Sequence, residues 1–251
     1  MSGHSKWSTI KRKKATVDAK RGQLFTRLAR EVAVAAREGG GDPESNFSLR
    51  IAIDRARSAN MPKENIERAV KRGTGEGSDG AAFEQITYEG YASHGVALII
   101  QVVTDNRNRA VSDIRHALGI VGGSLGEGGS VAWQFTQNAY FSFPSEGQDE
   151  DAIFELAVEA GADDVVFDDE TVEIFGPVES FKQIIDSLQA AGIQPEESEL
   201  RMIPNQEIEL DPDEAVQVLR VLESLDELDD VQVVFSNLNI SDEALAKLEP
   251  A

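Results

Sequence analysis

The stretch Gly73-Thr74-Gly75-Glu76-Gly77-Ser78-Asp79-Gly80 divides this 251-residue chain into two parts of different composition. Its glycines and small polar residues are typical of a linker. Up to Arg72 the chain has 17 Lys and Arg against 8 Asp and Glu, a net charge of +9. The part after Arg72 has 7 basic and 37 acidic residues, a net charge of −30. The sequence therefore predicts a basic unit joined by a linker to an acidic body.

Three amphipathic helices are predicted before the linker. Apolar residues recur at helical spacing from Gly22 to Glu38, from Glu44 to Ala59 and from Pro62 to Arg72. Glycine and proline interrupt the pattern between these segments. Because three short helices with one apolar face each can share a small core, we expect a basic helical domain over residues 1–80, including an N-terminal arm and the linker.

Strands and helices alternate after the linker. The segment from Tyr140 to Ile203 has the order β-α-β-β-α-β, which is the split βαβ pattern of ferredoxin-like folds. The flanking segments are expected to supply a strand at Val96–Val103, a helix at Asn106–Val121, a strand at Val131–Phe135, a strand at Glu207–Leu210, a helix at Asp211–Leu228 and a strand at Val231–Phe235.

The elements before and after this segment together make a second split βαβ unit. The two halves of that unit are separated in the sequence by the first unit, which must therefore be inserted into it. We therefore expect a multidomain α and α+β protein, with an N-terminal three-helix domain followed by two ferredoxin-like α/β domains. The middle domain is expected to be discontinuous, with residues 81–134 plus 206–251, and the last domain, residues 135–205, to be inserted into it.

The N-terminal arm is the strongest candidate for a binding site. Its side chains are predicted to contact nucleic acid because Lys and Arg neutralise phosphates and a tryptophan can stack on an unpaired base. A solubilising tail is the alternative, and the charge asymmetry favours nucleic acid. The arm, up to the start of the first predicted helix, contributes Lys6, Trp7, Lys11, Arg12, Lys13, Lys14, Lys20 and Arg21.

Two further groups of basic residues stand out. Arg68, Lys71 and Arg72 form a strip on the third predicted helix, which either contacts nucleic acid or is a solvated face. Arg107 and Arg109 lie at a strand-to-helix corner in the acidic body, where basic residues are few. They can bind a phosphate or the acidic surface of a neighbouring domain, and the domain contact is favoured.

Several classes of site lack support in the sequence. The chain has no cysteine, and its three histidines lack metal-ligand spacing, so we expect no metal site and no cofactor. No nucleophile arrangement indicates an enzyme. Acidic clusters such as 168–170 and 226–230 leave a metal-dependent hydrolase as a remote alternative. The glycine loop at 122–129 follows a helix and precedes a strand, the reverse of a nucleotide-binding loop.

No apolar run is long enough to span a bilayer, and no signal core follows Met1. We therefore expect a cytoplasmic protein with no membrane partner. The absence of cysteine fits a reducing compartment.

Several motifs distributed over nearly the whole length carry a family resemblance. They are Met1-Ser2-Gly3-His4-Ser5-Lys6-Trp7, Lys14-Ala15 with Asp18, Arg21-Gly22, Phe25, Asn60-Met61-Pro62-Lys63, Tyr88-Glu89-Gly90-Tyr91, Thr104-Asp105-Asn106-Arg107-Asn108-Arg109 and Gly122-Gly123-Ser124-Leu125-Gly126. With these motifs the chain resembles the YebC/PmpR family, which includes the mitochondrial translational activator of cytochrome oxidase. The resemblance implies three domains and non-enzymatic control of gene expression. Members have been described as DNA-binding transcriptional regulators and as translation factors acting at the ribosome.

We therefore expect a non-enzymatic regulator of gene expression that binds nucleic acid through its N-terminal domain. The first hypothesis is a DNA-binding transcriptional regulator. The alternative is a translation factor that binds the ribosome or structured RNA, either ribosomal or transfer RNA. The sequence has no helix-turn-helix signature with base-reading residues, which favours recognition of backbone or shape. We expect the acidic domains to contact the ribosome or other proteins, or to influence which nucleic acid can approach.

Overall fold

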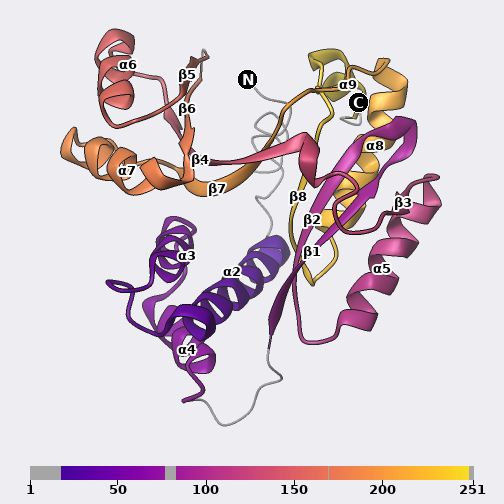
Figure 1. The fold of residues 1–251 in the computed structure, drawn as a ribbon, viewed down its shortest axis with the longest axis horizontal. Helices are drawn as coiled ribbons and strands as arrows, with labels where there is room; N and C mark the ends of the chain where they lie inside the picture. Colours follow the sequence, from indigo (N-terminus) through magenta and orange to yellow (C-terminus); the bar gives the residue numbers. More distant parts are fainter. Residues whose placement is uncertain (1–17, 77–82, 169, 249–251) are drawn as a thin grey trace.

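The computed structural model describes residues 18–76, 83–168 and 170–248. The described chain forms a helical unit and two α/β units, which Figure 1 shows at the lower left, at the right and at the upper left. The helical unit precedes the linker, and both sheets follow it. This is the multidomain α and α+β class that the sequence predicts.

In the described residues 18–76, three helices pack around one apolar core. They are α2 (Asp18–Gly39), α3 (Phe47–Ser58) and α4 (Lys63–Gly73). The core is formed by the apolar faces predicted from helical spacing, and its buried members include Leu28, Val32, Leu49, Ile53, Ile66 and Ala69. The Asn46 side chain accepts a hydrogen bond from Leu49 N and donates to the carbonyls of Ala35 and Gly40. One buried amide therefore caps α3 and fixes the end of α2 beside it.

The first sheet has the strand order β3-β1-β2-β8, and its neighbouring strands are antiparallel. Its strands are β1 (Glu84–Tyr91), β2 (Ala97–Thr104), β3 (Ser124–Leu125) and β8 (Val231–Ser236). Helices α5 (Arg107–Ile120) and α8 (Pro212–Asp226) cover one face of the sheet, and α9 (Asp242–Leu248) packs against α8. Alternate residues of β2 point into this core, including Leu98, Ile100 and Val102.

The second sheet has the order β5-β6-β4-β7, again with antiparallel neighbours. Its elements follow one another as β4 (Phe135–Pro144), α6 (Glu150–Glu159), β5 (Asp164–Phe167), β6 (Thr171–Pro177), α7 (Phe181–Ala190) and β7 (Glu197–Pro204). The predicted β-α-β-β-α-β order is confirmed. Both helices cover one face of the sheet, where Phe141, Phe143 and Ile174 are buried.

Both sheets use the same spatial arrangement with different chain connections. In the second sheet the strands, numbered along the unit, lie in the order 2-3-1-4. The first sheet has this order if β2, β3, β1 and β8 take the places of strands 1, 2, 3 and 4. The strand that corresponds to strand 3 is therefore β1, which comes from the start of the α/β region. The chain leaves the first sheet after β3, builds the second sheet and returns at β8.

Three expectations about the first sheet need correction. The segment Val131–Phe135 is no strand of this sheet, because residues 132–134 form a 3-10 turn and Phe135 begins β4. The segment Glu207–Leu210 forms only a single bridge, from Ile208 to Leu238. The central strand β1 is not among the predicted elements, because its residues Glu84–Tyr91 are mostly polar and only partly buried.

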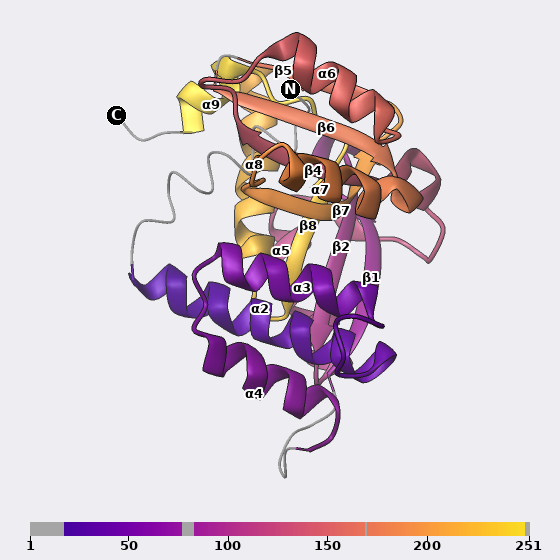
Figure 2. The same cartoon turned by 90° about the vertical axis from the view of Figure 1, so that its left-hand side faces the viewer.

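The three units contact one another directly. The face of the first sheet away from α5 and α8 packs Ala97 and Ile99 against Val131 and Phe135, where the second sheet begins. Figures 1 and 2 both show α3 beside β7. The ring of Phe47 at the start of α3 meets the edge of the Phe181 ring, with centroids 5.4 Å apart. The helical unit is therefore held against both sheets.

Candidate nucleic-acid interface

The predicted basic residues divide into those outside and those inside the described chain. Lys6, Trp7 and the cluster Lys11, Arg12, Lys13 and Lys14 lie outside the described residues. Lys20 and Arg21 belong to the first turns of α2. The structure therefore places the end of the arm, at the start of α2, and the basic strip on α4.

The strip on α4 is exposed. Arg68 and Lys71 are exposed, and within the described part of the chain their side chains make no ion pair or hydrogen bond. The guanidinium of Arg72 lies 4.5 Å from the ring centroid of Phe83, a cation–π distance. Phe83 also lies 5.3 Å from the guanidinium of Arg30, and its carbonyl accepts a hydrogen bond from Arg37. Two of the three predicted cations thus remain available to phosphate.

The start of α4 has the opposite charge. A four-residue turn at 59–62 joins α3 to α4, and Asn60 within it has a positive φ of 59°. Helix-turn-helix proteins use such a turn and read bases with the start of the second helix. Here that position carries two exposed carboxylates, Glu64 and Glu67, and one cation, Lys63, which lies 3.7 Å from Glu67. Carboxylates there would meet phosphate on entering a groove, so the basic end of α4 is suited to backbone contact.

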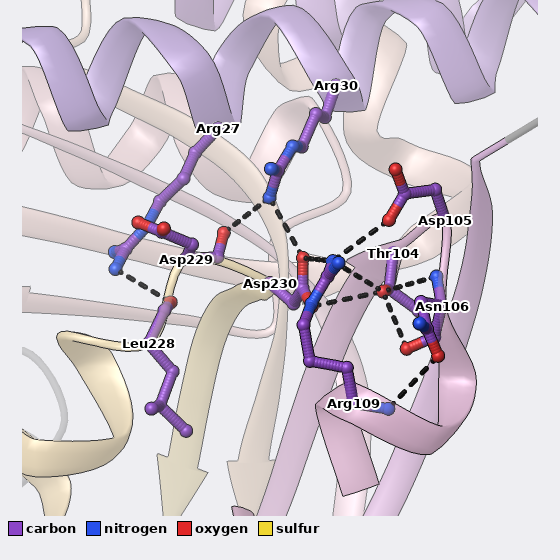
Figure 3. A network of polar contacts seen from close by, with 9 residues as sticks. All are labelled: Arg27, Arg30, Thr104, Asp105, Asn106, Arg109, Leu228, Asp229 and Asp230. Atoms are coloured by element: carbon purple, nitrogen blue, oxygen red, sulfur yellow. Dashed lines mark hydrogen bonds and ion pairs between the residues drawn. The ribbon is translucent and has the colours of Figure 1, made fainter. Parts of the chain in front are cut away.

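Other arginines of α2 point into the molecule. Figure 3 shows Arg27 and Arg30 reaching the segment between α8 and β8. Arg27 donates to the carbonyls of Asp226 and Leu228, and Arg30 donates to the Asp229 carbonyl at 2.6 Å. Burial lowers the pKa of the Arg27 guanidinium, although Asp226 and Asp229 act in the opposite direction. These arginines hold the helical unit against the acidic body.

One carboxylate, that of Asp230, receives donors from two units. Arg30 of α2 lies 3.2 Å from Asp230 Oδ1, and Arg109 of α5 lies 2.8 Å from Asp230 Oδ2. The Thr104 hydroxyl donates to the same carboxylate at 3.1 Å. Asn106 caps α5 by accepting a hydrogen bond from Arg109 N. The hydrogen bonds that Arg109 donates to Asp230 and Asp105, together with the negative charge of these carboxylates, raise the pKa of Arg109.

The structure thus gives Arg107 and Arg109 carboxylate partners within their own α/β unit. Arg107 makes two hydrogen bonds of 2.6 Å to Glu84, at the start of β1. Arg109 reaches the helical unit only through the Asp230 carboxylate that it shares with Arg30. A phosphate at either arginine would have to displace a carboxylate.

A second set of ion pairs between the units joins α3 to β7. Arg55 lies 2.7 Å from Glu31 of α2 and 3.1 Å from Glu199 of β7. Burial opposes the charge of Arg55, but Glu31, Glu199 and Glu197 outweigh burial and raise its pKa. The sequence alone predicted no role for Arg27, Arg30 or Arg55. Two features of the sequence could have indicated these contacts: the arginines opposite the apolar face of the first helix, and the acidic tract at 226–230.

The glycine loop after α5 is held by a carboxylate. Glu89 of β1 accepts hydrogen bonds from the backbone N–H groups of Gly129, Val131 and Ala132, at 2.7 to 2.8 Å. Desolvation would raise the pKa of Glu89, but these three bonds bring it below its usual value. Gly122 and Gly129 have positive φ angles of 75° and 88°, as expected for turns. The N–H groups that could bind a phosphate are therefore occupied by a side chain.

A cavity of about 270 Å³ lies between α5 and the segment 227–231, beside the Asp230 network. Its lining includes Asp113, Glu227, Asp229 and Asp230 but only one basic residue, Arg109. This charge would repel a phosphate. Over the described ranges, no group of three or more His, Asp or Glu is arranged to hold a metal ion. Among these residues there is also no helix long and apolar enough to cross a membrane.

The fold and the charged surfaces define a class: a basic helical unit docked through arginines onto an acidic body of two ferredoxin-like sheets. Two family models match the chain, the TACO1/YebC N-terminal domain over residues 5–76 and the TACO1/YebC second and third domain over residues 83–238. The chain therefore belongs to the TACO1/YebC family, as its motifs indicated.

Curated relatives match over the full length. A protein of Acidithiobacillus ferrooxidans named "probable transcriptional regulatory protein" is 53% identical over 249 residues, which cover 99% of each chain. A protein of the same name from Geotalea uraniireducens is 48% identical and covers 99% of this chain and 100% of its own. The crystal structure of a conserved hypothetical protein from Aquifex aeolicus has a TM-score of 0.84 and 42% identity, with coverage of 91% and 94%.

Proposed function

We propose that this protein regulates gene expression by binding nucleic acid through its N-terminal arm and the basic end of α4. The observation that carries this proposal is the charge division between +9 up to Arg72 and −30 after it. A polyanion is attracted to the first part and repelled by the second. Arg68 and Lys71 are exposed and have no ion pair or hydrogen bond to any described residue, so they add positive charge to the surface of the helical unit.

We propose that the activity is binding without catalysis. Family relatives carry the name of a regulatory protein, which supports this assignment. Within the acidic cluster at 226–230, the Asp230 carboxylate is engaged by Arg30 and Arg109, which argues against the remote alternative of a metal-dependent hydrolase.

DNA is our first candidate ligand, because the relatives are named as transcriptional regulators. Structured RNA, including the ribosome, is the second candidate. It is favoured by Glu64 and Glu67 at the start of α4, which oppose entry of this helix into a major groove. Contacts to phosphates and to helix shape suit RNA as well as DNA.

A parallel salt titration tests the proposal. The full chain is titrated against a DNA duplex and a structured RNA of equal length between 50 and 200 mM salt, the range over which ~6–10 phosphate contacts change affinity by ~10³–10⁵. The ligand held more tightly at the higher salt is the physiological class. Ribosome co-sedimentation that is lost when Lys11, Arg12, Lys13 and Lys14 become Glu would assign translation. Binding that is weak for both ligands and insensitive to salt would contradict the proposal.

A further inference from the structure

The second sheet has a polar face on the side away from α6 and α7. Because side chains alternate along a strand, Tyr140 and Ser142 of β4 point away from the core that contains Phe141 and Phe143. On β6, Glu173 alternates in the same way with Val172 and Ile174. Ser142 lies opposite Glu173 on one side and opposite Glu197 on the other.

Charged side chains are concentrated on this face. Arg201 is 1% exposed, and its guanidinium lies 3.4 Å from the ring centroid of Tyr140 and 2.7 to 2.8 Å from Glu197 and Glu199. Arg55 of α3 joins the group through Glu199. Among the described residues of this cluster, the two guanidinium groups contact three carboxylates, those of Glu31, Glu197 and Glu199, whereas the carboxylate of Glu173 contacts the Tyr140 hydroxyl.

Glu173 is the member whose charge is least compensated. Its residue is 2% exposed, and Oε1 accepts a hydrogen bond of 2.7 Å from the neutral hydroxyl of Tyr140. Within the described chain Oε2 has no partner, and the buried Ser142 hydroxyl opposite it also has none. A buried carboxylate is costly without a charged or strong donor. This position therefore fits an ammonium or guanidinium group.

The chain contains a segment with this chemistry before α2. Residues 1–17 carry Lys6, Lys11, Arg12, Lys13 and Lys14, while the unit they would meet, residues 135–205, has 17 acidic and 2 basic residues. The segment joins α2 at Asp18, about 13 Å along the helix from Arg27, which contacts the acidic body. Seventeen extended residues reach up to about 55–60 Å, which gives the segment a long reach from the start of α2.

We propose that the polar face of the second sheet, centred on Glu173, binds the chain's own basic N-terminal segment when nucleic acid is absent. The carboxylates there imitate the phosphates that the segment contacts in a complex. Nucleic acid and the polar face then compete for the same cations, so binding releases the segment from the sheet. The competition, but not the docking itself, rests on the proposed function.

Paramagnetic NMR on the full chain tests the docking. The chain has no cysteine, so Ser8→Cys provides a single site for a nitroxide label without removing a positive charge. We expect strong loss of amide signal on β4 and β7, at Tyr140, Ser142 and Glu199, in a dilute sample. A mixture of labelled and isotope-enriched chains should show no such loss. Signal loss only in the mixture would assign a second copy as the occupant, and loss elsewhere or none would overturn the proposal.

Two variants test the charge. Glu173→Gln keeps the size of the side chain and should restore the amide signals, whereas Glu179→Gln, on the exposed surface of the same unit, should not. A second variant replaces Lys11, Arg12, Lys13 and Lys14 by Gln. These residues lie outside the described fold, and the variant should restore the signals as well. Signals that stay broadened in both the Glu173→Gln and the arm variant would overturn the proposal.

Adding a DNA duplex or a structured RNA separates this inference from the proposed function. Release of the segment on adding the ligand, with affinity raised about fivefold or more by Glu173→Gln, supports both. Broadening that persists because neither ligand binds contradicts the proposed function alone. Tight ligand binding by a chain that never shows broadening contradicts the docking alone.

Discussion

Arg30 and Asp230 join the helical unit to the acidic body, with 3.2 Å between Arg30 Nη1 and Asp230 Oδ1. Their side chains are 18% and 7% exposed, so solvent screens the pair only in part. Arg109 binds the same carboxylate from α5. A single side chain therefore fixes α2, α5 and the start of β8 relative to one another, as Figure 3 shows.

Asp230→Asn should destabilise the fold by about 1–3 kcal/mol, because two guanidinium groups lose a charged acceptor. The measurement is the free energy of unfolding in urea at neutral pH. Asp163→Asn, which removes an exposed carboxylate from the turn before β5, is the matched control and should change nothing measurable. Equal stability of the two variants would show that the Asp230 network contributes no net stability.

Glu89→Gln should loosen the loop at 126–134 at neutral pH. The carboxylate has a pKa below the ordinary value of about 4.3, so its contribution is present above that value and is lost as pH falls through the lowered pKa. At pH 7 the variant should lose about 1–3 kcal/mol of local stability, measured by amide hydrogen exchange at Gly129, Val131 and Ala132.

The difference between the wild type and Glu89→Gln should shrink as the pH falls below 4. Glu127→Gln, on an exposed residue of the same loop, should exchange like the wild type at every pH. A difference that persists unchanged into acid would show that the three hydrogen bonds do not require the ionised carboxylate.

Two glycine substitutions in the helical unit should have opposite effects. A Cβ at Gly73 would lie 2.2 Å from the backbone carbonyl oxygen of Ala33, so Gly73→Ala should push α4 away from α2 and destabilise the fold by about 1–3 kcal/mol. Gly22 lies on α2, and among the described residues no neighbouring atom lies within 4 Å of a Cβ added there. Gly22→Ala should therefore stabilise the fold by about 0.5–1 kcal/mol.

Thermal unfolding followed by circular dichroism compares the two glycine variants. The result that would count against the packing of α2 on α4 is a Gly73→Ala protein as stable as the wild type. If Gly22→Ala instead lowered the stability, the first turns of α2 would not be helical in solution.

The elements that sequence could predict are those with a strong apolar period. The faces of α2, α3 and α4 and the order of the second sheet are of this kind, because each buries one clear stripe or alternation. The strand β1 could not be predicted from hydrophobic period, since Glu84, Gln85, Thr87 and Glu89 give it a polar composition. It takes a central place through pairing with β2 and β3, which is a tertiary effect.

The same limit applies to the candidate site. Charge composition predicts nucleic-acid contact at the arm and on α4, and this stays a prediction, with Arg68 and Lys71 exposed on α4. Composition could not distinguish these cations from Arg27, Arg30 and Arg55, which face acidic partners far away in the sequence. Only the fold brings residues 226–230 and Glu199 to these arginines.

The salt dependence of DNA-duplex binding tests the central claim most directly. Each phosphate contact contributes about 0.9 to the slope of log affinity against log salt concentration. We expect replacement of Lys11, Arg12, Lys13 and Lys14 by Gln to reduce the slope by as much as about 3.6, and replacement of Arg68 and Lys71 by about 1.8. Gln at Lys182 and Lys247, two cations of the acidic body, should leave the slope unchanged. Arm and α4 variants that keep the affinity and the slope of the wild type would contradict the account.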